Sequence, residues 1–106
     1  MITTMKRLKE IYNKVLESAM HESELTLEQL ANSRAENCVI TRVVIVETLI
    51  KLGLTENDIV RLSGMSQQRI NSLKNSAKYR LSGLAAKILK DEIWNQVKEL
   101  TCNIQK

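Results

Sequence analysis

Residues 55–80 read TENDIVRLSGMSQQRINSLKNSAKYR, and this stretch predicts two helices joined by a tight turn. Thr55 followed by Asp58 is a variant of the capping box, which starts a helix by satisfying its first free N–H groups. Gly64 stands where a helix end needs a residue that accepts positive φ, and Ser66 can cap a new helix two residues later. The stretch is therefore expected to form a helix-turn-helix with its turn at Gly64.

The apolar spacing within this stretch agrees with that prediction. Helix 66–77 carries a single apolar stripe, and its other side chains are polar. Ile59 and Ile70 have the separation at which two steeply crossing helices would bring them into contact. The position after Ile59 usually holds a small residue, which lets the two helices approach closely. Here it holds Val60, so we expect the two helices to cross at a slightly larger distance. We place the whole helix-turn-helix at 55–78.

The positive charge of the chain is concentrated in the same region. Residues 1–60 carry seven basic and nine acidic side chains, residues 61–80 carry five basic and no acidic ones, and residues 81–106 carry four and three. The total is a net charge of +4. A basic, acid-free helix predicts contacts with phosphate groups.

The remaining sequence predicts an all-α fold. We expect a compact bundle of about six helices in a single domain that spans residues 1–106, because 106 residues support one core. The four further helices are a first helix over 4–20, a short helix capped by Thr26 and Gln29, a long helix over 36–52 and a C-terminal helix over 83–101. The helix over 36–52 is apolar on more than one face, so it should lie at the centre.

Several single residues invite a functional reading. Arg42 lies deep in the apolar central helix, where a charge needs a partner or a route to the surface, and the sequence leaves its role open. Cys38 and Cys102 are too far apart to resemble a zinc or redox motif; Cys38 is expected to be buried, and any function of the pair is left open. His21 has no second histidine with which to bind a metal. Trp94 is expected to anchor the C-terminal helix to the core, with a dimer contact as the second reading.

Whole classes of function find no support in the sequence. The chain lacks glycine-rich phosphate loops, a nucleophile elbow and clustered metal ligands, so we expect no enzyme and no cofactor. It also lacks an apolar run of the length that a membrane span needs, and its first residues do not resemble a signal peptide. We expect a cytoplasmic protein with no membrane partner.

The order of elements resembles the C-terminal DNA-binding domain of the bacterial chromosomal replication initiator DnaA, of the Trp-repressor-like helix-turn-helix class. The matching features are Arg34 with Arg42 eight positions later, the run VITRVVIVETLIKLGLTENDIVRLSG at 39–64, and MSQQRIN at 65–71. In that family the loop arginine contacts DNA, and an Asp-His-Thr-Thr signature reads bases. Here the signature positions hold SQQR, at 66–69. The resemblance implies the fold, duplex DNA binding and a DNA contact from Arg34.

Together these features predict a protein that binds double-stranded DNA by placing helix 66–77 in the major groove. The candidate base-reading residues are Gln67, Gln68, Arg69 and Asn71. The candidate phosphate-binding residues are Arg34, Arg61, Ser66, Lys74, Lys78 and Arg80. Transcriptional regulation and an accessory role in replication or on a mobile element both stay open, as does the target sequence.

Two other functions compete with this one. A protein-protein adaptor could use the outer face of the amphipathic helix 83–101 without any role on DNA. Single-stranded RNA binding ranks third, because the chain holds only three aromatic residues and none lies within 55–78. A homodimer through the C-terminal helix is a further hypothesis, since one half-site alone would bind weakly.

Overall fold

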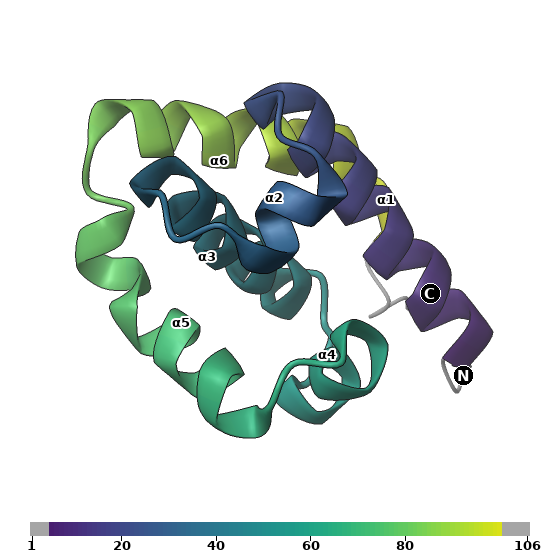
Figure 1. Cartoon of the computed structure of the whole chain (residues 1–106). Helices are drawn as coiled ribbons and strands as arrows, with labels where there is room; N and C mark the ends of the chain where they lie inside the picture. The colour runs from purple at the N-terminus through teal and green to yellow at the C-terminus, as the bar shows by residue number, and fades with distance from the viewer. Residues whose placement is uncertain (1–4, 101–106) are drawn as a thin grey trace.

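The structure is a computed structural model that describes residues 5–100, and within that range it is a bundle of helices without strands (Figure 1). The helices are α1 (Met5–Ser23), α2 (Leu27–Asn32), α3 (Glu36–Lys51), α4 (Glu56–Ser63), α5 (Gln67–Arg80) and α6 (Leu84–Val97), followed by a 3₁₀ turn at Lys98–Leu100. The predicted all-α bundle of about six helices is confirmed.

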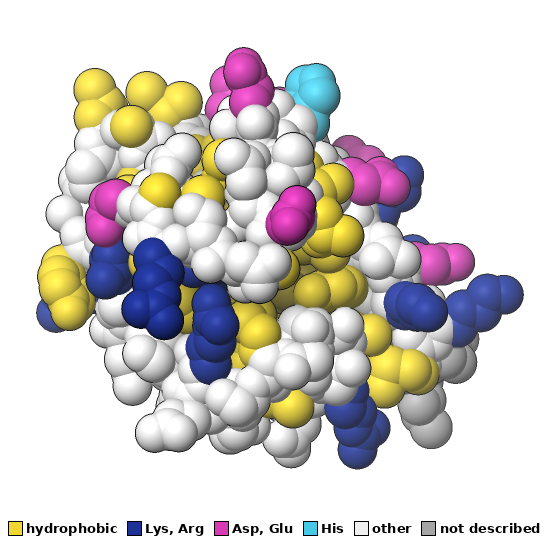
Figure 2. Space-filling view, viewed as in Figure 1, with side chains coloured by type: hydrophobic (Ala, Val, Ile, Leu, Met, Phe, Trp, Pro, Cys, Tyr) yellow, Lys and Arg dark blue, Asp and Glu magenta, His cyan; other side chains and the backbone are white. Residues whose placement is uncertain are grey.

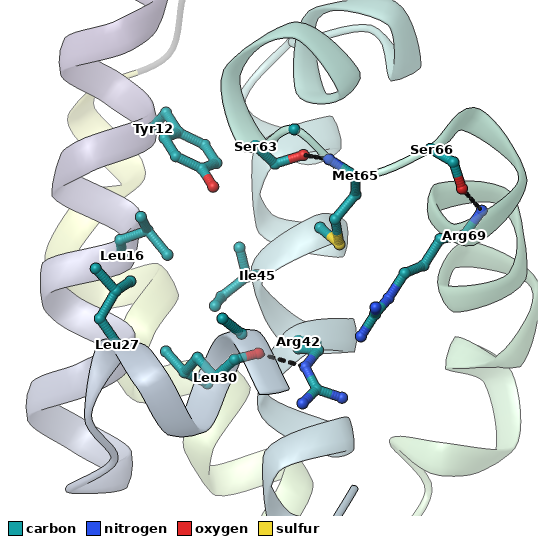
Figure 3. Close-up of a pocket in the computed structure, with 12 residues that line it drawn as sticks. Tyr12, Leu16, Leu27, Leu30, Arg42, Ile45, Ser63, Met65, Ser66 and Arg69 are labelled. Atoms are coloured by element: carbon teal, nitrogen blue, oxygen red, sulfur yellow. Dashed lines mark hydrogen bonds between the residues drawn. The ribbon is translucent and has the colours of Figure 1, made fainter. Parts of the chain in front are cut away.

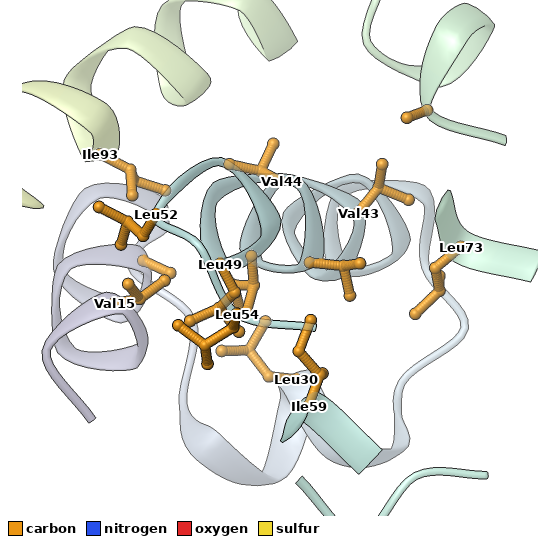
Figure 4. Close-up of a cluster of buried hydrophobic side chains, with 14 of the residues drawn as sticks. Val15, Leu30, Val43, Val44, Leu49, Leu52, Leu54, Ile59, Leu73 and Ile93 are labelled. Carbon is orange, nitrogen blue, oxygen red and sulfur yellow. The ribbon is translucent and has the colours of Figure 1, made fainter. Parts of the chain in front are cut away.

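Helix α3 is the centre of the bundle, as its apolar composition predicted. It contacts all five of the other α-helices, which surround it in Figure 1. Its side chains Val43, Val44, Val46 and Leu49 are fully buried, and Figure 4 shows several of them among core residues from the neighbouring helices. Removing this apolar surface from water is the main force that holds the bundle together.

The predicted caps set the helix boundaries. Thr26 and Gln29 form a capping box at the start of α2, and Thr55 and Asp58 form another at the start of α4. Gly53, with φ of 110°, follows the end of α3. These capping residues satisfy the free N–H and C=O groups at helix ends. Because each cap involves only residues close together in the sequence, it fixes a helix boundary without help from the rest of the fold.

Two helices extend beyond their predicted ends. Helix α1 continues to Ser23, whose hydroxyl donates to the Ala19 carbonyl, and Glu24 then ends the helix with φ of 61°. Helix α5 continues to Arg80, so the predicted end of this helix at residue 77 is wrong. The buried Leu81 explains the longer α5, because it continues the apolar stripe one turn beyond Ala77 and its N–H donates to the Ala77 carbonyl.

Arg42 links α3 to the C-terminal end of α2. Its side chain is buried, with the residue only 7% exposed, and it donates from Nε to the Leu30 carbonyl and from Nη2 to the carbonyls of Gln29 and Ser33. The last carbonyls of a helix lack partners within the helix and carry partial negative charge. The partner that a buried charge requires is therefore a helix end rather than a carboxylate.

The structure also describes the surroundings of Cys38, Trp94 and His21, which were singled out in the sequence. Cys38 is buried, as predicted. Trp94 packs against the core, and the Nζ atom of Lys51 lies 4.2 Å from the centre of its ring. His21 is exposed in the last turn of α1. Cys102, like residue 101 of the predicted C-terminal helix, lies outside the described residues.

Within residues 5–100, no cluster of three or more His, Cys, Asp or Glu side chains is placed to hold a metal ion. Over the same residues, each helix is too short or too polar to cross a membrane.

Candidate nucleic-acid interface

Helices α4 and α5 are joined by a three-residue turn at 64–66. Gly64 adopts a left-handed φ of 78°, and its N–H donates to the Val60 carbonyl. The Met65 N–H donates to the Ser63 hydroxyl at 3.1 Å, and the Ser66 hydroxyl accepts the N–H of Arg69 at 3.1 Å. Because each residue of the turn is held in place, the start of α5 has a fixed direction relative to α4.

The buried side of α5 fixes which face points outward. Ile70 is fully buried, as is Ile59 of α4, while Val60 is only half-buried. Leu73 and Ala77 complete the buried stripe, and α5 packs on α3 through it. The rest of α5 is left to solvent along the rim of the bundle (Figure 1).

The four candidate base-reading residues lie near the start of α5. Gln67, Gln68, Arg69 and Asn71 are all exposed, and all belong to the first turn and a half of α5. Gln67 is not free: its amide Nε2 donates to Glu56 Oε1 of α4 at 2.7 Å. The N-terminal part of α5 therefore carries Gln68, Arg69 and Asn71 without an acidic residue of its own, while Gln67 is bound to Glu56 of α4.

The candidate phosphate-binding residues surround α5. Arg34, Arg61, Ser66, Lys74 and Lys78 are exposed, and Arg80 is partly exposed. Figure 2 shows basic side chains at the left of one face, beside an apolar hollow, and others at its right and lower edge, with acidic side chains mainly in its upper half. Arg34 lies in the loop between α2 and α3, two residues before Glu36, which pairs with Arg80. This contact places the loop beside the C-terminal end of α5.

Two carboxylates that the sequence analysis did not connect with α5 bind its cations. Glu56 Oε2 accepts from Lys74 Nζ at 2.7 Å, and Glu36 lies 3.0 Å from Arg80 Nη1. The hydrogen bond from Lys74 lowers the pKa of Glu56 below its ordinary value, and the same bond raises the pKa of Lys74. Both groups are therefore charged at neutral pH, and Glu56 competes with any phosphate for Lys74.

Arg69 turns back toward α3 instead of pointing straight outward. In Figure 3 its guanidinium extends toward that of Arg42, and no residue in 5–100 forms a hydrogen bond or an ion pair with its side chain. Burial lowers the pKa of Arg42, and the positive charge of Arg69 lowers it further. Two like charges thus lie near each other without an anion between them.

The acidic partners were missed because they depend on tertiary structure. Glu56 is 11 positions from Gln67 and 18 from Lys74, and Glu36 is 44 from Arg80. Sequence spacing predicts ion pairs only three or four positions apart within one helix. A clue did exist for Glu56, since it lies in the first turn of α4 and a steep crossing brings that turn close to α5.

No protein-family model, curated protein or solved structure matches this chain. What the exposed face of α5 does is therefore inferred from its own geometry and chemistry.

Proposed function

We propose that this protein binds double-stranded DNA with α5 in the major groove. The observation that carries the proposal is the outer face of α5, which is exposed, polar and basic and begins at a capped, tightly held turn. The major groove of B-form DNA admits an α-helix, and the N-terminal residues of such a helix face the base edges. In this protein those residues are Gln67, Gln68, Arg69 and Asn71.

The chemistry of these side chains suits base reading. Gln and Asn can donate and accept a pair of hydrogen bonds with adenine, and Arg can donate two to guanine. Arg34, Arg61 and Lys78 would contact phosphates on either side of the groove and fix the register of the protein without reading sequence. Ser66, Lys74 and Arg80 would also contact phosphates. Lys74 would first have to leave Glu56, and Arg80 would have to leave Glu36.

The resemblance to the DnaA C-terminal domain supports duplex DNA as the partner and Arg34 as a contact. Its base-reading signature is replaced here by SQQR at 66–69, so we expect a different target sequence. We propose a small cytoplasmic bacterial regulator, acting on transcription or as an accessory factor in replication or on a mobile element.

Selection from a pool of random-sequence duplexes tests the base-reading role of Arg69. We expect the protein to enrich a defined site, and Arg69→Ala to lose about 1–3 kcal/mol on that site and to relax selection at one position. Lys78→Ala is the matched control, because Lys78 is an exposed cation further along the same helix. Lys78→Ala should lower the affinity for all duplex sequences equally. If both variants lose affinity equally on every sequence, Arg69 does not read a base.

Replacing Glu56 should strengthen DNA binding. Glu56→Gln keeps the shape of the side chain but removes the charge that holds Lys74, so Lys74 can bind phosphate. We expect the dissociation constant for duplex DNA to fall by a factor on the order of 3–10 at low salt. Glu92→Gln on α6 makes the same change in net charge at an exposed site. An equal gain from Glu92→Gln would show that only net charge matters.

A protein partner on α6 is the second candidate function. Leu84 and Ile88 are 75% and 52% exposed, and they lie four positions apart, so they share one face of α6. The partner could be another protein or a second copy of this chain. If the partner is a second copy of this chain, sedimentation should show self-association, and the double variant Leu84→Ser with Ile88→Ser should abolish it. A monomer at concentrations that saturate DNA would exclude the homodimer.

A further inference from the structure

A hollow of about 430 Å³ lies between α1, α2 and α3 on one side and the turn between α4 and α5 on the other (Figure 3). Its walls are mainly apolar, formed by Leu16, Leu27, Leu30, Ile45 and Met65. It opens to solvent as the apolar depression seen in Figure 2. This volume lies within the range of about 300–1,000 Å³ that is usual for small-molecule sites in proteins.

Two arginines without a carboxylate partner line this hollow. Arg42 uses Nε and Nη2 for the α2 carbonyls, while Nη1 has no hydrogen-bond partner within residues 5–100. Arg69 has no side-chain partner in the same part of the chain, and its guanidinium points toward Arg42. A carboxylate placed between the two groups would accept hydrogen bonds from both and remove their repulsion.

A third polar group lies across the hollow from the arginines. The Tyr12 hydroxyl points into it in Figure 3, and no residue among those described forms a hydrogen bond with this hydroxyl. Burial raises the pKa of Tyr12, so the hydroxyl keeps its proton at neutral pH and can donate. The hollow thus combines an apolar body with a polar group at one side and positive charge at the other.

We propose that this hollow binds a small amphipathic carboxylic acid, with its carboxylate between Arg42 and Arg69 and its apolar body against Leu30, Ile45 and Met65. The volume suits a small organic molecule. Charge complementarity selects an acid, because a neutral molecule would leave the arginines unpaired and a cation would be repelled. Nothing in this binding step depends on DNA.

The position of the hollow couples it to the proposed DNA interface. Ser63, Gly64, Met65 and Ser66 line it, and these residues form the end of α4 and the turn before α5. A bound acid would hold the Arg69 side chain against α3, where it cannot reach a base edge. This part of the inference rests on the proposed function, and it makes the acid an inhibitor of sequence-specific binding.

Calorimetry on the protein alone tests the site, with decanoate, decanol and decylammonium as probes of equal chain length. We expect decanoate to bind with one molecule per chain, decanol to bind at least about tenfold more weakly, and decylammonium more weakly still. Arg69→Gln should weaken decanoate about tenfold while leaving decanol unchanged. Lys87→Gln removes a cation from an exposed site on α6 and should change nothing.

Three results would overturn the assignment. The first is equal affinity for decanoate and decylammonium, and the second is unchanged decanoate binding by Arg69→Gln. The third is equal affinity for inorganic phosphate and decanoate, which would show that the site binds anions and that its apolar walls contribute nothing to the affinity. Amide chemical shifts locate the ligand: changes at Tyr12 and Met65 support the hollow, and changes confined to Leu84 and Ile88 contradict it.

A separate titration distinguishes failure of the site from failure of the proposed function. With decanoate at saturation, the affinity for the selected duplex should fall while non-specific affinity is retained. If decanoate binds but no duplex does, the ligand site stands and the DNA proposal fails. If both bind and neither affects the other, the coupling is refuted and both sites stand.

Discussion

Ile70→Ala is expected to lower the free energy of unfolding by about 2–5 kcal/mol, the usual cost of removing a fully buried isoleucine side chain beyond Cβ. Ile70 is 0% exposed and fixes the start of α5 against the core. Domains of this size have total stabilities of about 5–15 kcal/mol, so the loss would be a large share. Chemical denaturation measures it directly as a lower midpoint at constant slope.

The matched control is Ile88→Ala on α6, which removes the same atoms from a side chain that is 52% exposed. We expect a change below about 1 kcal/mol, because less apolar surface returns to water and alanine favours the helix. If the two variants lose the same stability, α5 is not anchored as the structure describes.

Arg42→Met is expected to cost about 2–3 kcal/mol of stability, the second large effect. Methionine fills a similar space, but it leaves the carbonyls of Gln29, Leu30 and Ser33 without their charged donor. Helix α2 has only six residues and would lose the contact that satisfies its C-terminal end. Urea denaturation should show the loss, and hydrogen exchange should localise it to α2.

Arg42→Lys separates the hydrogen bonds from the charge. Lysine keeps the positive charge but concentrates its donors at one atom, so it cannot reproduce the fork that reaches three carbonyls. We expect its stability to lie between those of the parent protein and Arg42→Met. A methionine variant as stable as the parent would mean that water satisfies the α2 carbonyls equally well.

Local signals allowed most of the fold to be predicted. Thr26, Thr55 and Ser66 each cap a helix where the sequence places them, and Gly64 has the positive φ that its position required. These features depend on residues within a few positions of one another, so their physics is visible in the sequence. The error at the end of α5 arose because Leu81 was not recognised as part of the apolar stripe.

The environment of the candidate interface could not be predicted in the same way. The sequence identified Gln67, Arg69 and Lys74 as exposed and polar, but not that Glu56 binds two of them or that Arg69 turns toward Arg42. These contacts exist only after α3, α4 and α5 have packed. The role of Arg42 was hidden for the same reason, since its acceptors are carbonyls, which every residue carries.

The most direct test of DNA binding by α5 is the affinity for a random-sequence duplex at several salt concentrations. We would compare the parent protein with a variant that carries both Arg61→Gln and Lys78→Gln. The logarithm of the association constant should fall linearly with the logarithm of salt concentration, and the double variant should reduce that slope by about 2. The same slope and affinity in both proteins, or no binding at low salt, would contradict the account.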